Sequence, residues 1–283
     1  MRALVAAALI AFAAACATVP PVQHAFVVGR DGGFAGAPLP CDGVTNAADA
    51  EAALPLPGPE LRVLSWNIHK NADPGWSVDL ARFAADSDLL LLQEAALTAE
   101  LRTALARAGF DALLAGSFTL NGHETGVLNA ARVPPARACV QRRFEPLLQL
   151  PKSALIARYR MHGTADTIAV ANVHAINFVL TLSDYRAQLE AVARELAGHR
   201  GPMIVAGDFN TWNPSRLEAV DEVMRGLELE PVLPRVDTRT RFLGRQVDYV
   251  FVRGLEVVHA AAPDVRSSDH NPVQATLRVP GAR

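Results

Sequence analysis

Lysine is almost missing from this 283-residue chain, which contains only Lys70 and Lys152, so arginine carries nearly all of the positive charge. The formal net charge is −2, and the sequence has no basic tail and no strongly cationic domain. Because non-specific binding to nucleic acid depends on many phosphate contacts from basic side chains, the charge does not indicate tight binding to a polyanion.

Long hydrophobic runs are also few, and the clearest one begins the chain. The run from Ala3 to Ala15 is too short for a transmembrane helix but has the length of a signal-peptide core. Small residues before Cys16 are typical of lipoprotein processing, which would leave Cys16 acylated and membrane-attached. Ala15-Cys16-Ala17 fits ordinary signal cleavage equally well. Both readings predict a signal peptide over 1–16 and an exported protein, either periplasmic or a membrane-anchored lipoprotein. An alanine-rich start without a targeting role is the alternative.

Cysteine is scarce, with three residues in the whole chain. Either processing route removes or modifies Cys16 and leaves Cys41 and Cys139 as a pair. In an oxidising compartment this pair is a candidate disulfide that would tie the N-terminal region to the rest of the domain. Two unrelated buried thiols are the alternative reading.

The rest of the chain divides near residue 60. Residues 17–59 are rich in Gly, Ala and Pro without sustained periodicity, which predicts an extended N-terminal linker. Residues 60–280 then show alternating strand and helix patterns and form the predicted domain. Expected strands cover 61–66, 89–93, 125–132, 153–161, 168–174, 203–207, 247–253 and 273–278, and expected helices cover 78–85, 98–108 and 183–197, with one more starting at Asn213-Pro214. The irregular alternation favours two sheets with outer helices over one doubly wound sheet.

Polar groups follow many of these apolar strands directly. They are Asn67, Glu94, His174 with Asn177, Asp208 with Asn210, Asp248 at the start of a strand, and Asp269-His270. A buried strand that ends in such a group delivers it to the rim of a sheet. If the groups converge, they provide oxygen ligands for a hard divalent cation together with a proton-transfer set. That combination predicts hydrolysis of a phosphate ester.

Roles follow from residue type. Glu94 comes after four leucines and Gln93, where an unpaired carboxylate would be costly, so it is the expected principal metal ligand, with Asn67 nearby. Asp208 is expected to orient a water, and Asn210 to donate to a phosphate oxygen. Gly-Asp-Phe-Asn could instead be a self-capped turn, and Asn67 alone would more often be a turn residue.

The histidines supply the remaining chemistry. Asp248 is expected to hydrogen-bond His270, which would act at the scissile phosphate or the attacking water. His174 is expected as a general acid toward the leaving oxygen, with Asn177 as a phosphate donor. Asp269 is assigned to the metal or to a water on the phosphate side. An ordinary surface Asp-His pair is the alternative for Asp269-His270.

Taken in order, these motifs are similar to those of the endonuclease/exonuclease/phosphatase superfamily. The motifs are Ser65-Trp-Asn67, Leu92-Gln-Glu94, Asn172-Val-His174-x-x-Asn177, Gly207-Asp-Phe-Asn210, Val247-Asp248-Tyr and Ser268-Asp269-His270, and the match runs from Leu61 to Val279. The group includes DNase I-like nucleases, exonuclease III, inositol-phosphate 5-phosphatases and bacterial sphingomyelinases. Each motif alone is weak, but six in order are specific.

The resemblance implies a four-layer αββα sandwich of two mostly antiparallel sheets flanked by helices. It also implies a Mg²⁺ or Mn²⁺ ion held chiefly by Glu94 near Asn67. One departure from the pattern is His69, because some nucleases of the group carry an acidic residue at that place, which leaves a second metal position open. Residues 1–60 have no counterpart.

The sequence thus predicts a monomeric, metal-dependent phosphodiesterase acting by in-line attack of water. A nuclease is the first expectation, although the near-neutral charge counts against it. A lipid-headgroup or sphingomyelin-type phosphodiesterase at a membrane is the second, although no long apolar hairpin is evident. A non-catalytic surface lipoprotein is the third, and the intact set of site residues argues against it.

Overall fold

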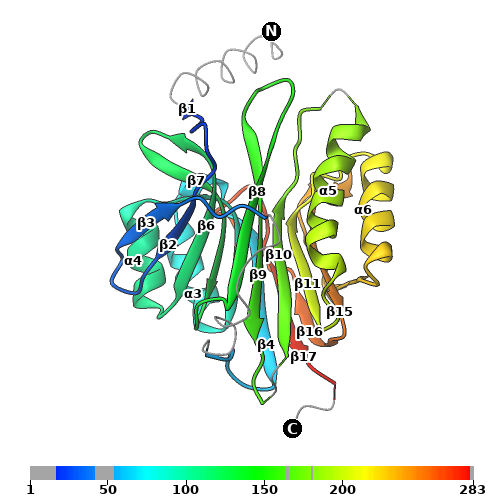
Figure 1. Ribbon diagram of the computed structural model, residues 1–283. Helices are drawn as coiled ribbons and strands as arrows, with labels where there is room; N and C mark the ends of the chain where they lie inside the picture. The colour runs from blue at the N-terminus through cyan, green and yellow to red at the C-terminus, as the bar shows by residue number, and fades with distance from the viewer. Residues whose placement is uncertain (1–16, 42–53, 164–165, 180, 281–283) are drawn as a thin grey trace.

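Two β-sheets packed face to face form the centre of the computed structural model, which describes residues 17–41, 54–163, 166–179 and 181–280 (Figure 1). The nine-stranded sheet has the order β16-β17-β4-β5-β7-β6-β2-β3, with β1 paired to β6. Its strands are β1 (Ala17–Thr18), β2 (Ala25–Val28), β3 (Phe34–Ala37), β4 (Glu60–Asn67), β5 (Leu89–Ala96), β6 (Asp111–Leu120), β7 (His123–Ala131), β16 (Glu256–Ala261) and β17 (Val273–Arg278).

The six-stranded sheet has the order β12-β15-β11-β10-β9-β8. Its strands are β8 (Arg137–Phe144), β9 (Pro151–Arg160), β10 (Thr167–His174), β11 (Met203–Asp208), β12 (Glu230–Pro231) and β15 (Asp248–Arg253). A separate hairpin joins β13 (Arg241–Phe242) to β14 (Arg245–Gln246). Only the pairs β4–β5 and β10–β11 are parallel, so both sheets are mostly antiparallel, as predicted.

Helices cover the outer faces of the two sheets (Figure 1). They are the 3-10 turn η1 (His69–Asn71), α3 (Trp76–Ala85), α4 (Ala99–Arg107), α5 (Leu182–Ala197) and α6 (Pro214–Gly226). Asn213 caps α6 by accepting a hydrogen bond from the Arg216 amide, and Pro214 occupies the first turn, so the predicted start of this helix is confirmed.

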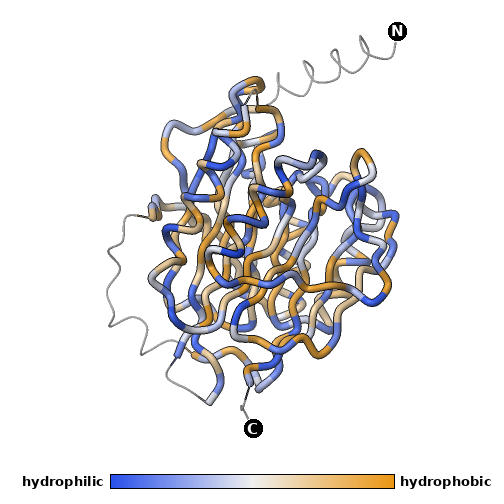
Figure 2. Tube along the Cα trace, turned by 90° about the vertical axis from the view of Figure 1, so that its right-hand side faces the viewer, coloured by the Kyte–Doolittle hydropathy of each residue, from blue (hydrophilic) through white to orange (hydrophobic). Residues whose placement is uncertain are grey.

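Three apolar layers hold the sandwich together, because successive strand residues point to opposite faces. Leu89 and Leu91 belong to the cluster between the two sheets, whereas Leu90 and Leu92 pack with α3 and α4. A third cluster lies between the six-stranded sheet and helices α5 and α6. Figure 2 shows apolar stretches running through the middle of the molecule. The predicted four-layer αββα sandwich is confirmed.

The N-terminal region departs from the prediction. Residues 17–59 were expected to form a linker outside the domain, but β2 pairs with β6 along the sheet, and β3 extends the sheet beyond β2. These strands are short and lie between Gly and Pro residues, so they leave no periodic signal. The signal peptide predicted over 1–16 lies outside the described residues.

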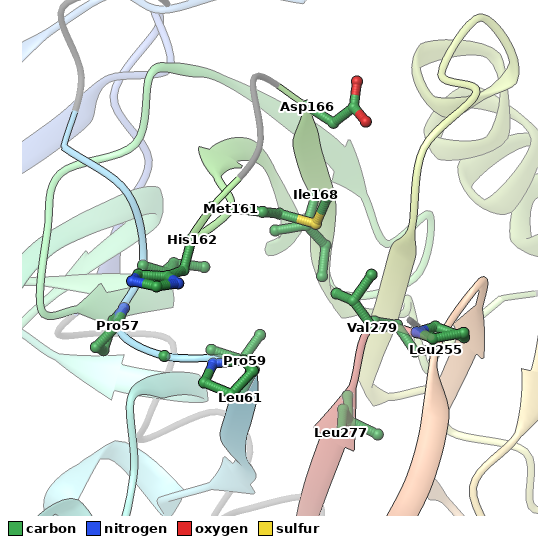
Figure 3. A pocket seen from close by; sticks show the side chains of 14 residues that line it. Pro57, Pro59, Leu61, Met161, His162, Asp166, Ile168, Leu255, Leu277 and Val279 are labelled. Atoms are coloured by element: carbon green, nitrogen blue, oxygen red, sulfur yellow. The ribbon is translucent and has the colours of Figure 1, made fainter. Parts of the chain in front are cut away.

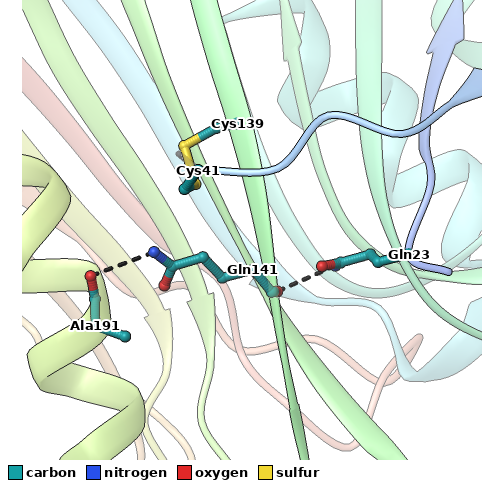
Figure 4. Close-up of a disulfide and its surroundings, with 5 residues drawn as sticks. All are labelled: Gln23, Cys41, Cys139, Gln141 and Ala191. Atoms are coloured by element: carbon teal, nitrogen blue, oxygen red, sulfur yellow. Dashed lines mark hydrogen bonds between the residues drawn. A yellow bond between two sulfur atoms is a disulfide. The ribbon is translucent and has the colours of Figure 1, made fainter. Parts of the chain in front are cut away.

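The disulfide predicted between Cys41 and Cys139 is present (Figure 4). Cys139 lies in β8, so the bond ties the end of the N-terminal region to the six-stranded sheet. The Gln23 side chain strengthens this connection by donating a 3.1 Å hydrogen bond to the Gln141 carbonyl oxygen. The N-terminal region is therefore held to both sheets.

Candidate active site

Glu94 owes its position to an irregularity in β5. The register between β5 and β7 shifts between Leu92 and Ala95, and Glu94 adopts a left-handed φ of 51°. A bulge of this kind re-aims one side chain, and a left-handed conformation at a non-glycine residue must be held by its surroundings. Glu94 is thereby turned toward the other sheet, where it meets Lys152 of β9 and His174 of β10.

Both lysines of the chain contact Glu94. These contacts were not predicted from the sequence. Lys152 lies 3.2 Å from one carboxylate oxygen, and Lys70 from η1 is hydrogen-bonded to the other. Burial alone would raise the pKa of Glu94, but Lys152, Lys70 and His174 hold it well below its usual range. Burial would likewise lower the pKa of Lys152, yet the nearby carboxylates, Glu94 foremost, raise it. The sequence feature that could have drawn attention to these two residues is the scarcity of lysine in the chain.

Three neighbouring strands of the six-stranded sheet place their polar ends in one row. His174 is in register with Asp208, and Asp208 with Asp248. Close approach of the β10 and β11 backbones requires Gly207, where a Cβ atom would lie 1.9 Å from the Val173 carbonyl oxygen. Asp208 and Asp248 are almost fully buried.

Asp208 lies at the centre of the cluster. The Asn67 amide donates a 3.1 Å hydrogen bond to it from the other sheet, and the Nε2 atoms of His174 and His270 lie 3.4 Å and 4.0 Å away. Burial raises the pKa of Asp208 to about 6, with Asp248 adding to the rise and His270 opposing it. A carboxyl group with this pKa can act as a base near neutral pH.

His270 is paired with Asp248 through a 2.8 Å contact at Nδ1. Burial alone would lower its pKa, but Asp248 and Asp208 raise it to about 10, so the ring is a cation at neutral pH. The Trp66 indole fixes the same loop by donating to the His270 carbonyl oxygen. The predicted contact between Asp248 and His270 is therefore present.

His174, unlike His270, is neutral at neutral pH. Burial, assisted by Lys152, lowers its pKa well below 6.5, although Glu94 opposes the shift. A neutral imidazole is a weaker proton donor than the imidazolium expected of a general acid. It can still donate or accept a hydrogen bond between Glu94 and Asp208, which lie 3.7 Å and 3.4 Å from its Nε2.

The two predicted phosphate-binding amides lie on neighbouring loops. Asn210 has a left-handed φ of 50°, and its amide donates 3.0 Å to the Ala175 carbonyl oxygen. The Asn177 side-chain oxygen accepts a 2.7 Å hydrogen bond from the Trp212 indole, and its backbone amide donates to the buried Glu145. Both side-chain amides therefore stabilise the loops in which they lie, at the same rim as the catalytic cluster.

Asp269 is placed differently from the other predicted ligands. Its carboxylate is more than half exposed and lies 3.9 Å from His69, which is itself 2.7 Å from Asp73. Among the described residues it forms no ion pair or hydrogen bond with the lysines around Glu94 or with Asp208. Single ligand atoms of Asp269, His69 and Asp73 lie within 4.8 Å of one another, so Asp269 belongs to a second group of possible metal ligands beside the Glu94 cluster.

The remaining donors suit a hard cation. Single ligand atoms of Asp208, Asp248 and His270 lie within 4.8 Å of one another, and carboxylate and amide oxygens are the ligands that Mg²⁺ and Mn²⁺ prefer. Both Glu94 oxygens are matched by ammonium groups, which shows that this position accepts concentrated positive charge. Because His270 is a cation, the carboxylates are the donors that suit a divalent ion, Glu94 foremost, and Asn67 is linked to the same cluster by its 3.1 Å hydrogen bond to Asp208.

An apolar cavity lies away from this cluster. It has a volume of about 300 Å³, and its lining includes Leu61, Met161 and Leu277 (Figure 3). These residues lie at the strand ends opposite the predicted catalytic residues, because β17 starts beside Ser65 and ends at Arg278. None of the predicted site residues lines this cavity.

Comparisons with known proteins agree with this geometry. The model of the endonuclease/exonuclease/phosphatase family matches residues 64–270. A UPF0294 protein of Vibrio cholerae is 38% identical over 277 residues, which cover 98% of this chain and 96% of that protein. A Beutenbergia cavernae endonuclease/exonuclease/phosphatase structure has a TM-score of 0.59 at 21% identity and covers 80% of this chain and 73% of its own. ANGEL2, a 2′,3′-cyclic phosphatase, has a TM-score of 0.60 at 17% identity, with 80% and 98% covered.

Within the part of the chain that the structure describes, no helix combines the length and apolar character needed to cross a bilayer.

Proposed function

Because the chain belongs to the endonuclease/exonuclease/phosphatase family, whose members hydrolyse phosphate ester bonds, we propose that it is a divalent-metal-dependent phosphodiesterase. The observation that carries the proposal is the meeting of Glu94 from one sheet with His174, Asp208 and His270 at one rim. These residues lie far apart in the sequence, and no packing requirement explains so many buried ionisable groups in one place.

The residues divide the chemistry among them. Asp208 takes a proton from the attacking water, for which its raised pKa suits it. The His270 cation, held by Asp248, faces the charge that develops on the phosphoryl oxygens. Neutral His174 and the amides of Asn177 and Asn210 supply hydrogen bonds that orient the phosphate. A divalent cation bound at Glu94 and Asn67 would supply Lewis-acid stabilisation of the phosphorane oxygens or the leaving group.

Compartment and assembly belong to the same proposal. We propose an exported monomer, either periplasmic or anchored through an acylated Cys16. The Cys41–Cys139 bond supports an oxidising compartment, because structural disulfides persist there and are rare in the cytosol.

Hydrolysis of bis-(p-nitrophenyl) phosphate tests the proposal. The protein should be inactive after chelation and recover with Mg²⁺ or Mn²⁺. Glu94→Gln, Asp208→Asn and His270→Asn should each lower kcat by at least ~10²-fold, the scale for removing one preorganised group. His259→Asn, in the distant strand β16, is the matched control and should keep wild-type rates. Full activity in two of the three site variants, with circular dichroism unchanged, would reject the assignment.

The same assay separates the substrate classes. Plasmid DNA, RNA, sphingomyelin and phosphoinositides, each tested with and without metal, distinguish a nuclease from a lipid-headgroup phosphodiesterase. No turnover of any phosphodiester with a folded protein would favour the non-catalytic alternative.

A further inference from the structure

Exposed apolar side chains gather around the catalytic rim. Phe144 ends β8 opposite Pro151, which precedes Lys152, and Phe178 follows Asn177 directly. Phe242 and Leu243 lie in the β13–β14 hairpin, which leads into Asp248. These four side chains are between 42% and 72% exposed. Exposed apolar groups scattered singly need no explanation, but several around one rim indicate an interaction surface.

The β13–β14 hairpin is tied to the catalytic loop. The Thr240 hydroxyl, just before the hairpin, accepts a 2.8 Å hydrogen bond from the Asn271 amide and lies 3.4 Å from the Asp269 carbonyl oxygen. The tip, Leu243-Gly244, has positive φ at both residues, as a tight two-residue turn requires. The base of the hairpin that bears this apolar tip is therefore hydrogen-bonded to the residues on either side of His270.

Positive charge flanks the apolar tip. Arg241 and Arg245 occupy the two strands of the hairpin, and neither forms an ion pair with a residue that the structure describes. Arg241 donates a 3.2 Å hydrogen bond to the Gly244 carbonyl oxygen within the hairpin, so its charge stays beside the tip. Apolar side chains bracketed by guanidinium groups that no described carboxylate neutralises match the interface of an anionic lipid bilayer, where rings enter the acyl boundary and cations meet headgroup phosphates.

The chain also enters the fold at this end. Ala17 pairs with Leu120 at the end of β6, and the next strand, β7, places Gly126 opposite Ala95, beside Glu94. In Figure 1, β1 accordingly lies at the end of the sandwich opposite the C-terminus. Ala17, the first residue that the structure describes, therefore lies at the catalytic end of the folded domain.

From these observations we propose that the catalytic rim docks onto an anionic phospholipid bilayer and that the substrate is a phosphodiester in a lipid headgroup. This inference rests on the phosphodiesterase function proposed above. Nucleic acid fits the rim less well, because the highly exposed aliphatic side chain of Leu243 offers no ring on which a base could stack.

Vesicle co-sedimentation tests the docking. Residues 17–283, which contain every described helix and strand, are mixed in EDTA with vesicles of phosphatidylcholine, with or without phosphatidylglycerol. Wild type should bind the anionic vesicles, and Phe242→Ser/Leu243→Ser should lower the partition coefficient about tenfold, because two apolar side chains leave the interface. Phe34→Ser is the matched control, since Phe34 is 48% exposed at the opposite end of the sheet.

Each outcome decides the proposal. Failure of wild type to bind anionic vesicles, or equal losses in the rim and control variants with unchanged melting temperatures, would overturn it. Tighter binding to a DNA oligonucleotide, weakened by the rim variant, would reassign the surface to nucleic acid. Hydrolysis of bis-(p-nitrophenyl) phosphate should be unchanged in the rim variant. If the wild-type protein binds vesicles but does not hydrolyse bis-(p-nitrophenyl) phosphate, the proposed phosphodiesterase function is rejected and the docking surface is retained.

Discussion

Single residues set the charge balance of the site. Glu94 is enclosed by two ammonium groups and a neutral imidazole, whereas Asp208 has an amide and the His270 cation as neighbours. The lysines keep the first carboxylate ionised, whereas burial and the nearby Asp248 raise the pKa of the second to about 6 against the opposing effect of His270. Two buried carboxylates in one site are thus prepared for different tasks, one for a cation and one for a proton.

Lys152→Met should tighten Mn²⁺ binding. The lysine competes with a cation for Glu94 and repels it, and one unit charge at this distance is worth roughly 1–4 kcal/mol. We expect the Kd for Mn²⁺, measured by isothermal titration calorimetry, to fall about tenfold. Lys152→Arg, which keeps the charge, should bind Mn²⁺ as wild type does. Weaker binding in the methionine variant would show that the lysine supports the cation instead.

The Asp248–His270 pair should be visible in the pH dependence of stability. The folded-state pKa of His270 is about 10, above the unfolded value of about 6.5. The stability from this raised pKa is present in full below pH 6.5 and is lost as pH rises through 10. In EDTA, the free energy of unfolding from urea titrations should fall between pH 7 and pH 10. The fall should be smaller in Asp248→Asn by on the order of 2 kcal/mol. Parallel curves for the two proteins would contradict the pairing.

Elements of secondary structure aim these residues. The bulge in β5 turns Glu94 inward, and the close packing of β10 on β11 sets Asp208 beside His174. Gln93 and Asn172 join the two sheets below the site through a 2.8 Å hydrogen bond. The positions of Glu94, His174 and Asp208 are therefore set by the backbone of paired strands, and such fixed positions suit a preorganised site.

Gly207→Ala should disturb both β11 and the site. The added methyl group would lie 1.9 Å from the Val173 carbonyl oxygen, at a φ of 143° that favours glycine. We expect a loss of roughly 3 kcal/mol or more in the free energy of unfolding, measured with urea. Gly226→Ala is the control, because nothing lies within 4 Å of its added methyl group and alanine favours the helix. A neutral Gly207 variant would show that the strands can separate locally.

The sequence predicted the elements with strong periodicity and missed the weaker ones. Leu89–Ala96 and Leu182–Ala197 were found close to their observed bounds because an apolar run and a 3.6-residue pattern mark them. Besides the N-terminal strands and three two-residue strands, the longer strands Asp111–Leu120, Arg137–Phe144 and Glu256–Ala261 were missed. Glu256–Ala261 is a mostly exposed edge strand, and Arg137–Phe144 carries three arginines, so neither alternates clearly. The contacts of Lys70 and Lys152 with Glu94 depend on tertiary packing that no local pattern encodes.

The N-terminal region connects the two sheets of the molecule. Strands β1 to β3 add to the nine-stranded sheet, and Cys41 then bonds to the six-stranded sheet (Figure 4). Pairing of two scarce cysteines could be predicted from their number. Strand pairing by residues 17–41 could not, because its partners lie about a hundred residues further along the chain.

Removing the disulfide should destabilise the whole domain. Cys41 and Cys139 are separated by 98 positions, and closing a loop of this size removes unfolded-state entropy worth about 5 kcal/mol. Cys41→Ala/Cys139→Ala should therefore unfold at a clearly lower urea concentration than wild type. Dithiothreitol should lower the wild-type midpoint to that of the variant and leave the variant unchanged. A midpoint that ignores both treatments would show that strand pairing alone holds the N-terminal region.

The most direct test of the account is anomalous diffraction from crystals grown with Mn²⁺. A peak is expected within coordination distance of the Glu94 carboxylate, with Lys152 displaced from the oxygen it contacts in the metal-free protein. Crystals of Glu94→Gln should lose the peak. A manganese peak away from Glu94, or none at saturating Mn²⁺ with both lysines still on the carboxylate, would contradict a cation-dependent site at this rim.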